Sequence, residues 1–89
     1  MDTNQPSPLS CPCRFPIKAM GLAEADLPTL VTAIARRHAP DMDDSQTRVR
    51  PSRNGRYVSV TVVIEAVSQE QLDAIYRELS ANEHILVSL

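Results

Sequence analysis

Two hydrophobic periods divide the first half of this chain. Apolar and polar residues alternate over residues 14–20, which predicts a strand with one buried face that ends at Gly21. From Leu27 to Ala35 the apolar residues recur at spacings of three and four, which predicts an amphipathic helix. Asp26 suits the N-cap of this helix and Pro40 stops it. The first half is therefore expected to form one strand followed by one helix.

Alternation returns in two runs that flank Asn54-Gly55, the dipeptide most typical of a two-residue type I′ hairpin turn. Around that turn Val49 faces Val60, and all apolar positions fall on one face while the arginines of the first arm fall on the other. A one-residue slip would destroy this agreement. The pattern predicts an antiparallel hairpin whose first arm is a sheet edge, since that arm contains a proline.

The end of the chain repeats the order of helix and strand. Residues 67–80 place apolar side chains at helical spacing, and Ser68 with Gln71 fits a capping box. Residues 84–89 alternate again, which predicts a final strand. Its buried face is expected to carry Ile85, Val87 and Leu89, and its other face Leu86 and Ser88.

The order of elements predicts an α+β fold, the ferredoxin-like βαββαβ sandwich, with a four-stranded antiparallel sheet in the order 4-1-3-2 and two helices on one face. The expected core consists of Phe15, Ile17, Leu27, Leu30, Val31, Ile34, Val49, Val58, Val60, Val62, Ile64, Leu72, Ile75, Leu79, Ile85 and Val87. The sheet face without helices is expected to show Lys18, Met20, Arg48, Arg50, Tyr57, Ser59, Thr61, Val63, Leu86 and Ser88.

Length limits where a function can lie. The proline-rich start suggests a disordered tail over residues 1–13, which leaves one domain over residues 14–89. A domain of this size buries only about 60% of the surface of its unfolded chain. A groove, an exposed face or an interface between subunits is therefore a better candidate site than a buried catalytic pocket.

Charge and hydropathy exclude further classes. The net charge of −2 argues against a general nucleic-acid binder, and the exposed face offers only Tyr57 where RNA-binding sheets use two or three aromatic residues. No apolar run is long enough to span a membrane, and no secretory signal precedes the domain. A cytoplasmic location without a membrane partner is expected.

The basic residues give the best candidate site. Guanidinium groups bind carboxylates and phosphates, and a sheet can hold several at fixed spacing. The candidate ligand- or partner-binding residues are Lys18, Arg48, Arg50, Tyr57, Ser59 and Thr61. Arg53 and Arg56 in the hairpin loop extend the cluster without belonging to that face. The alternative is that charged edge strands only deter aggregation between sheet edges.

No combination of residues predicts catalysis, a metal or another cofactor. Cys11 and Cys13 lack the further ligands that zinc requires, and His38 and His84 stand without a nucleophile at recognisable spacing. The acidic run at residues 41–44 lacks the glycine and the terminal glutamate of a calcium loop, so an ordinary acidic part of a polar, solvated loop is expected. A protein that is not an enzyme is expected.

Three segments in this order, FPIKAMG, RHAP and RPSRNGRYVSVTV, resemble the YbeD-like family of small uncharacterised bacterial proteins. The resemblance covers residues 15–89. It implies a ferredoxin-like fold similar to ACT-type regulatory domains, which bind small ligands at dimer interfaces, and it implies a link to lipoate metabolism but no known reaction.

Residues and resemblance together predict a non-catalytic regulatory or binding module. Its partner would be an anionic small ligand or an acidic protein surface held on the open sheet face by Lys18, Arg48 and Arg50. The alternative is an interaction adaptor, or a homodimeric regulator paired through the open sheet face, that acts on a metabolic enzyme in lipoate or amino-acid metabolism.

Overall fold

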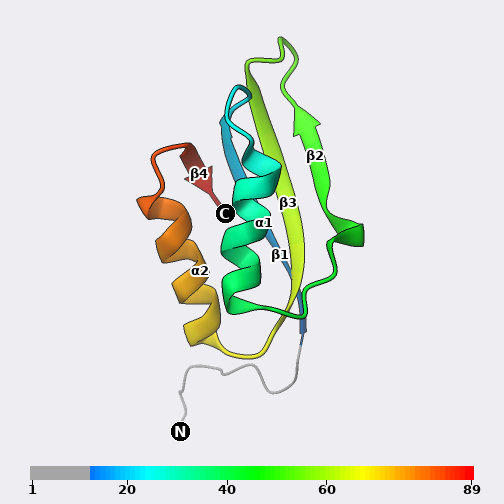
Figure 1. Cartoon of the computed structure of the whole chain (residues 1–89), viewed down its shortest axis with the longest axis vertical. Helices are drawn as coiled ribbons and strands as arrows, with labels where there is room; N and C mark the ends of the chain where they lie inside the picture. The colour runs from blue at the N-terminus through cyan, green and yellow to red at the C-terminus, as the bar shows by residue number, and fades with distance from the viewer. Residues whose placement is uncertain (1–12) are drawn as a thin grey trace, which may run out of the picture.

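The computed structural model describes residues 13–89, which form a four-stranded antiparallel sheet with two helices on one face (Figure 1). The elements in chain order are β1 (Cys13–Leu22), α1 (Leu27–His38), the short 3₁₀ helix η1 (Asp44–Gln46), β2 (Arg48–Pro51), β3 (Tyr57–Ala66), α2 (Gln69–Ala81) and β4 (Ile85–Ser88). The sheet order β2-β3-β1-β4 confirms the predicted ferredoxin-like arrangement. Of the predicted tail, all but Cys13 lies outside the described residues.

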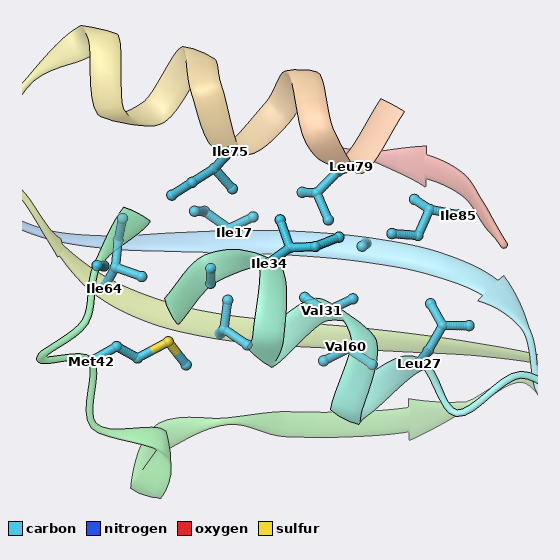
Figure 2. Close-up of a cluster of buried hydrophobic side chains, with 14 of the residues drawn as sticks. Ile17, Leu27, Val31, Ile34, Met42, Val60, Ile64, Ile75, Leu79 and Ile85 are labelled. Carbon is cyan, nitrogen blue, oxygen red and sulfur yellow. The ribbon is translucent and has the colours of Figure 1, made fainter. Parts of the chain in front are cut away.

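The core lies between the helices and the two long central strands. Ile17 of β1 and Val60 of β3 are fully buried, and Figure 2 shows Ile75 and Leu79 of α2 facing the strands from the other side. Met42, from the connection after α1, closes the end of the core near Ile64 and is only 8% exposed. The sequence predicted a polar loop there. Most of the predicted core is confirmed, although Phe15 and Leu30 are only partly buried.

The two helices begin differently. Ser68 Oγ accepts a hydrogen bond from the backbone N–H of Gln71 at 3.0 Å, as a capping box requires. Gln71 Oε1 in turn accepts from the backbone N–H of Val67 rather than that of Ser68. Asp26 occupies the N-cap of α1, but its side chain accepts no hydrogen bond from the helix, so the predicted side-chain cap is absent there. Neither helix is long and apolar enough to cross a membrane.

The hairpin has the predicted register but a different turn. Val49 faces Val60 and Arg50 faces Ser59, as expected. The backbone N–H of Ser52 donates to Tyr57 O at 2.8 Å, so four residues, 53–56, form the loop instead of two. Gly55 alone has a positive φ, 75°, whereas a type I′ turn would need one at Asn54 as well. Both loop lengths keep the same pairing, which is why the register survived.

Val49 is not a core residue. Its side chain is 49% exposed, although it lies directly opposite the fully buried Val60. The reason is the reach of the helices: α1 packs against β3 and β1, and α2 against β4 and β3, so the outermost strand β2 extends beyond the helical layer (Figure 1). The proline correctly predicted that β2 is an edge strand, and at this edge no helix covers Val49.

The register of the last strand also differs from the sequence prediction. Gly21 continues β1 instead of ending it and pairs with Ile85, whereas Met20 pairs with Val87, so Leu86 is an extra residue in a β-bulge. The bulge reverses the alternation beyond it. Val87 lies on the open face with 46% exposure, and Ser88 pairs with the buried Ala19 on the helix side, opposite to the predicted assignments.

Candidate functional site

The sheet face without helices is the surface that the strand register assembles from residues far apart in the sequence. Cross-strand pairing aligns its side chains in rows that run from β4 across β1 and β3 to β2. One row consists of Val87, Met20, Ser59 and Arg50. The next consists of Leu89, Lys18, Thr61 and Arg48, where Leu89 N donates to Lys18 O at 2.8 Å and Lys18 N to Leu89 O at 3.2 Å. We call this surface the open face.

The basic side of the open face consists of Lys18, Arg48 and Arg50. Arg48 and Lys18 flank Thr61 within one row, so their Cα atoms lie two strand spacings, about 10 Å, apart. All three cations are exposed, and within residues 13–89 none of them forms an ion pair. From residue 45 to residue 64 the chain holds four arginines and no acidic residue. Positive charge is thus concentrated here on a chain whose net charge is −2.

All six candidate residues lie on this one face. Thr61 stands between Lys18 and Arg48, whereas Ser59 stands between Met20 and Arg50, and Ser59 Oγ donates to Arg50 O at 3.5 Å. Tyr57 pairs with Leu22 one row further along, at 37% exposure, beside a groove of about 450 Å³ that the hairpin loop forms with the end of β1. Arg53 and Arg56 belong to that loop and not to the rows.

The apolar side of the open face consists of Met20, Leu22, Val87 and Leu89. Their exposed fractions run from 36% for Met20 to 68% for Leu89. The sequence placed Leu86 and Ser88 here because simple alternation was carried through β4. A glycine inside a strand is a known sign of a bulge, so Gly21 was the signal that could have corrected the register.

A second polar cluster joins the two helices away from the open face. Glu78 of α2 binds Arg37, whose Nε donates to Oε2 at 3.0 Å, and its Oε1 lies 2.8 Å from His38 Nε2. Hydrogen bonds from Arg37, and then from His38, lower the pKa of the Glu78 carboxyl below its ordinary value. Gln71 Nε2 adds a bond of 2.8 Å to the backbone carbonyl of His38. His38 therefore connects the end of α1 to α2, a contact that the sequence did not predict.

Beside this cluster, the end of α1 borders a groove of about 600 Å³ that the sequence did not predict. Arg14, Asp41 and Glu65 supply charges on its walls, and Pro40 and Val63 supply apolar surface. In the sequence, only the RHAP segment, residues 37–40, drew attention to this end of α1.

The acidic run that follows α1 serves the local structure. Asp43 accepts hydrogen bonds from the backbone N–H and the hydroxyl of Ser45, which lower the pKa of its carboxyl. Asp44 lies 3.6 Å from Arg36 in an ion pair. Among residues 13–89 no group of His, Cys, Asp and Glu side chains is arranged to hold a metal ion. The predicted interpretation as an ordinary acidic loop agrees with these contacts.

Low pH should weaken the contacts of Glu78 that connect α2 to α1. Because the pKa of Glu78 is lowered on folding, its carboxylate stabilises the fold above its ordinary pKa of 4.5, and this contribution is lost as the pH falls through the lower folded value. We expect Glu78→Gln to melt below wild type at pH 6 and the two melting temperatures to converge as the pH falls below 4.5 and Glu78 becomes protonated. Glu24→Gln, at an exposed carboxylate without an ion pair in the described chain, should track wild type throughout. Parallel pH profiles for wild type and Glu78→Gln would contradict this role.

Comparison with known proteins gives the family. The family model described as a protein of unknown function, DUF493, matches residues 7–89. The UPF0250 protein of Azotobacter vinelandii is 45% identical over 86 residues, covering 94% of each chain. That of Nitrosomonas europaea is 44% identical over 78 residues, covering 88% of this chain and 87% of its own. That of Neisseria gonorrhoeae is 40% identical over 86 residues, covering 97% and 94%. The resemblance to small uncharacterised bacterial proteins is confirmed, and this chain belongs to the DUF493 family.

Proposed function

We propose that this protein is a non-catalytic regulatory or binding module that recognises anionic groups on its open face. The observation that carries the proposal is the set of cations Lys18, Arg48 and Arg50, held in two adjacent rows with no carboxylate partner among residues 13–89. A charge that an intramolecular ion pair does not neutralise is available to an incoming carboxylate or phosphate. The hydroxyl of Thr61 adds a hydrogen-bond donor between Lys18 and Arg48, and that of Ser59 lies beside Arg50.

The chemistry of these groups favours binding over catalysis. A guanidinium stays protonated at every physiological pH and therefore cannot act as a general base toward the hydroxyl beside it. Lys18 lies between Thr61 and Leu89, and no carboxylate or imidazole side chain shares its row. Such a face can hold and orient an anion, which suits a cytoplasmic module that regulates or recruits another molecule.

The alternative is an adaptor or a homodimeric regulator of a metabolic enzyme, with lipoate metabolism as the area that the family resemblance suggests. The exposed apolar side supports this candidate, because contiguous apolar surface beside polar groups is typical of protein interfaces. ACT-like dimerisation through the open face is one form that it could take.

Charge reversal tests the anion site. We expect Arg48→Glu combined with Arg50→Glu to abolish the rise in melting temperature that anionic probes cause, with amino acids, nucleotides, acyl-carboxylates and a glutamate hexapeptide as the probes. The folded domain itself should persist, because both side chains are exposed. Arg77→Glu on the exposed outer surface of α2 makes the charge change of each single substitution, half that of the pair, and as the control it should respond like wild type.

Two results would reject the proposed function. One is that no anionic probe raises the melting temperature of wild type at low ionic strength. The other is that the double variant and Arg77→Glu respond alike, because the effect would then reflect net charge and not the open face. Sedimentation of wild type over a range of concentrations distinguishes the homodimeric alternative.

A further inference from the structure

We propose that the open face binds an amphipathic helix of another protein, with its apolar stripe on Met20, Leu22, Val87 and Leu89 and its acidic flank against Arg48 and Arg50. This inference rests on the proposed function and specifies the partner of the same site. It starts from the corrected register, which places the apolar residues of β1 and β4 around Lys18 on one half of the face and Arg48 and Arg50 on the edge strand β2.

The shape of the face favours a macromolecule over a small ligand. Small molecules bind in concave pockets that cover most of their surface. The three grooves described for the chain lie at the end of α1, at the hairpin loop and beside α1, and none of them is lined by Lys18, Arg48 or Arg50. A sheet face that is exposed and partly apolar is instead the surface on which helices pack.

The dimensions of the face match one helix. β1 and β3 each have ten residues, which extend over about 33 Å. From β4 to β2 the sheet covers three strand spacings, about 14 Å, and a helix with side chains is about 10–12 Å wide. One helix of about 18 residues, about 27 Å long, therefore contacts the apolar side and the guanidiniums of β2 at the same time.

The β2 edge of the sheet disfavours the other common mode of binding, in which a partner adds a strand to the sheet. Ser52 donates to Tyr57, and the alternation of an antiparallel ladder then directs the backbone of Arg50 toward β3 and that of Pro51 outward. Proline has no N–H, so within β2 only Val49 offers an outward donor. An incoming strand would find one N–H donor on this four-residue edge. A partner that the arginines attract is therefore expected to bind on the open face instead of pairing with β2.

The positive charge of β2 disfavours a second copy of this chain as the partner that covers the open face. Glu65, at the far end of β3 opposite Arg14, is the one carboxylate among the described residues of the open face. Two such faces related by a two-fold axis place the arginines of β2 either against each other or against the apolar strand β4 of the partner. Neither arrangement neutralises them, whereas a partner with carboxylates beside an apolar stripe does.

The test uses the full-length chain labelled with ¹⁵N and three synthetic helical peptides of about 18 residues. The first has a leucine stripe flanked by glutamates, the second has the same stripe flanked by lysines, and the third has the glutamates without the leucines. We expect the first peptide to shift the amide signals of β1, β3 and β4 on titration and to bind at least about tenfold more tightly than the other two.

Two double variants assign the binding to the two sides of the face. Met20→Ser with Val87→Ser, at side chains 36% and 46% exposed, should weaken the first peptide about tenfold without unfolding the domain. Arg48→Glu with Arg50→Glu should weaken it at least as much, and Arg77→Glu should leave it unchanged. Amide mapping on wild type gives the binding surface independently of any variant.

The outcomes separate this inference from the proposed function. If the glutamate peptide without leucines binds as tightly as the first, the anion site stands and the amphipathic helix is rejected. If the lysine-flanked peptide binds equally well, both are rejected, because charge then plays no part. A concentration-dependent dimer that Met20→Ser with Val87→Ser dissociates would make a second copy the occupant and overturn the inference, as would the absence of any shift on the open face.

Discussion

Replacement of Gly21 by alanine is expected to destabilise the fold by about 3 kcal/mol, the upper part of the range for overpacked sites. A Cβ at this position would lie 2.2 Å from the backbone oxygen of His84 and 2.8 Å from a methyl carbon of Leu27. The leucine side chain could rotate, but the carbonyl belongs to the turn that leads into β4. The added methyl group must therefore displace that strand or break its pairing with β1.

Gly55→Ala provides the matched control for this effect. Gly55 has a φ of 75°, so an alanine there is strained by about 1 kcal/mol, yet its Cβ would meet nothing within 4 Å. Urea unfolding of both variants compares a steric cost with a conformational cost at the only two glycines of the chain. If Gly21→Ala proved no less stable than Gly55→Ala, the close approach of β4 to Gly21 would be wrong.

The general fold was predictable because independent features of the sequence agreed. Helical spacing, strand alternation, a capping residue and a hairpin register all required the same order of elements, and each constrained the next. The hairpin register held even though the turn did not, because loops of two and four residues preserve the same pairing. In the native loop the Asn54 side chain accepts hydrogen bonds from the N–H of Arg56 and from Ser52 Oγ, so local polar contacts decided the turn type.

The misplaced residues have two physical causes. The first is that alternation shows which side chains share a face but not what covers that face. Val49 lies on the same side of the sheet as Val60, yet β2 extends beyond both helices. Val87 was misplaced because a bulge adds one residue to β4, and a period of two cannot detect an insertion. Both errors arose in edge strands: β2 lies beyond the helices, and β4 lacks a second neighbour that would fix its register.

The candidate site was predictable in its basic side and not in its apolar side. Lys18, Arg48 and Arg50 lie on strands whose register the hairpin and the long β1–β3 ladder determine. Val87 and Leu89 lie on β4, beyond the bulge, so sequence alternation assigned them to the core. The mixed character of the open face, on which the proposed helix partner depends, is thus a result of the structure.

Ile17→Ala is expected to cost about 3–4 kcal/mol, within the range measured for large buried aliphatic residues. Ile17 is fully buried in a central strand, and in Figure 2 it lies between that strand and α2, close to Ile75. Pairing with Val62 of β3 holds the backbone of Ile17 in place, so the space left by the lost side chain cannot collapse easily. Because a domain of this kind has only about 5–15 kcal/mol of total stability, the loss should appear as a large decrease in the urea midpoint.

Val87→Ala decides whether this cost reflects burial or only the apolar character of a strand residue. Simple alternation assigns Ile17 and Val87 to the same core, whereas the bulge places Val87 on the open face with 46% exposure. The expected change is below about 0.5 kcal/mol, the usual range for exposed positions. A loss of about 2 kcal/mol or more would mean that Val87 is buried, which requires β4 to pair without the bulge. Met20 would then pair with Leu86, and the apolar side of the open face would exchange Val87 and Leu89 for Leu86.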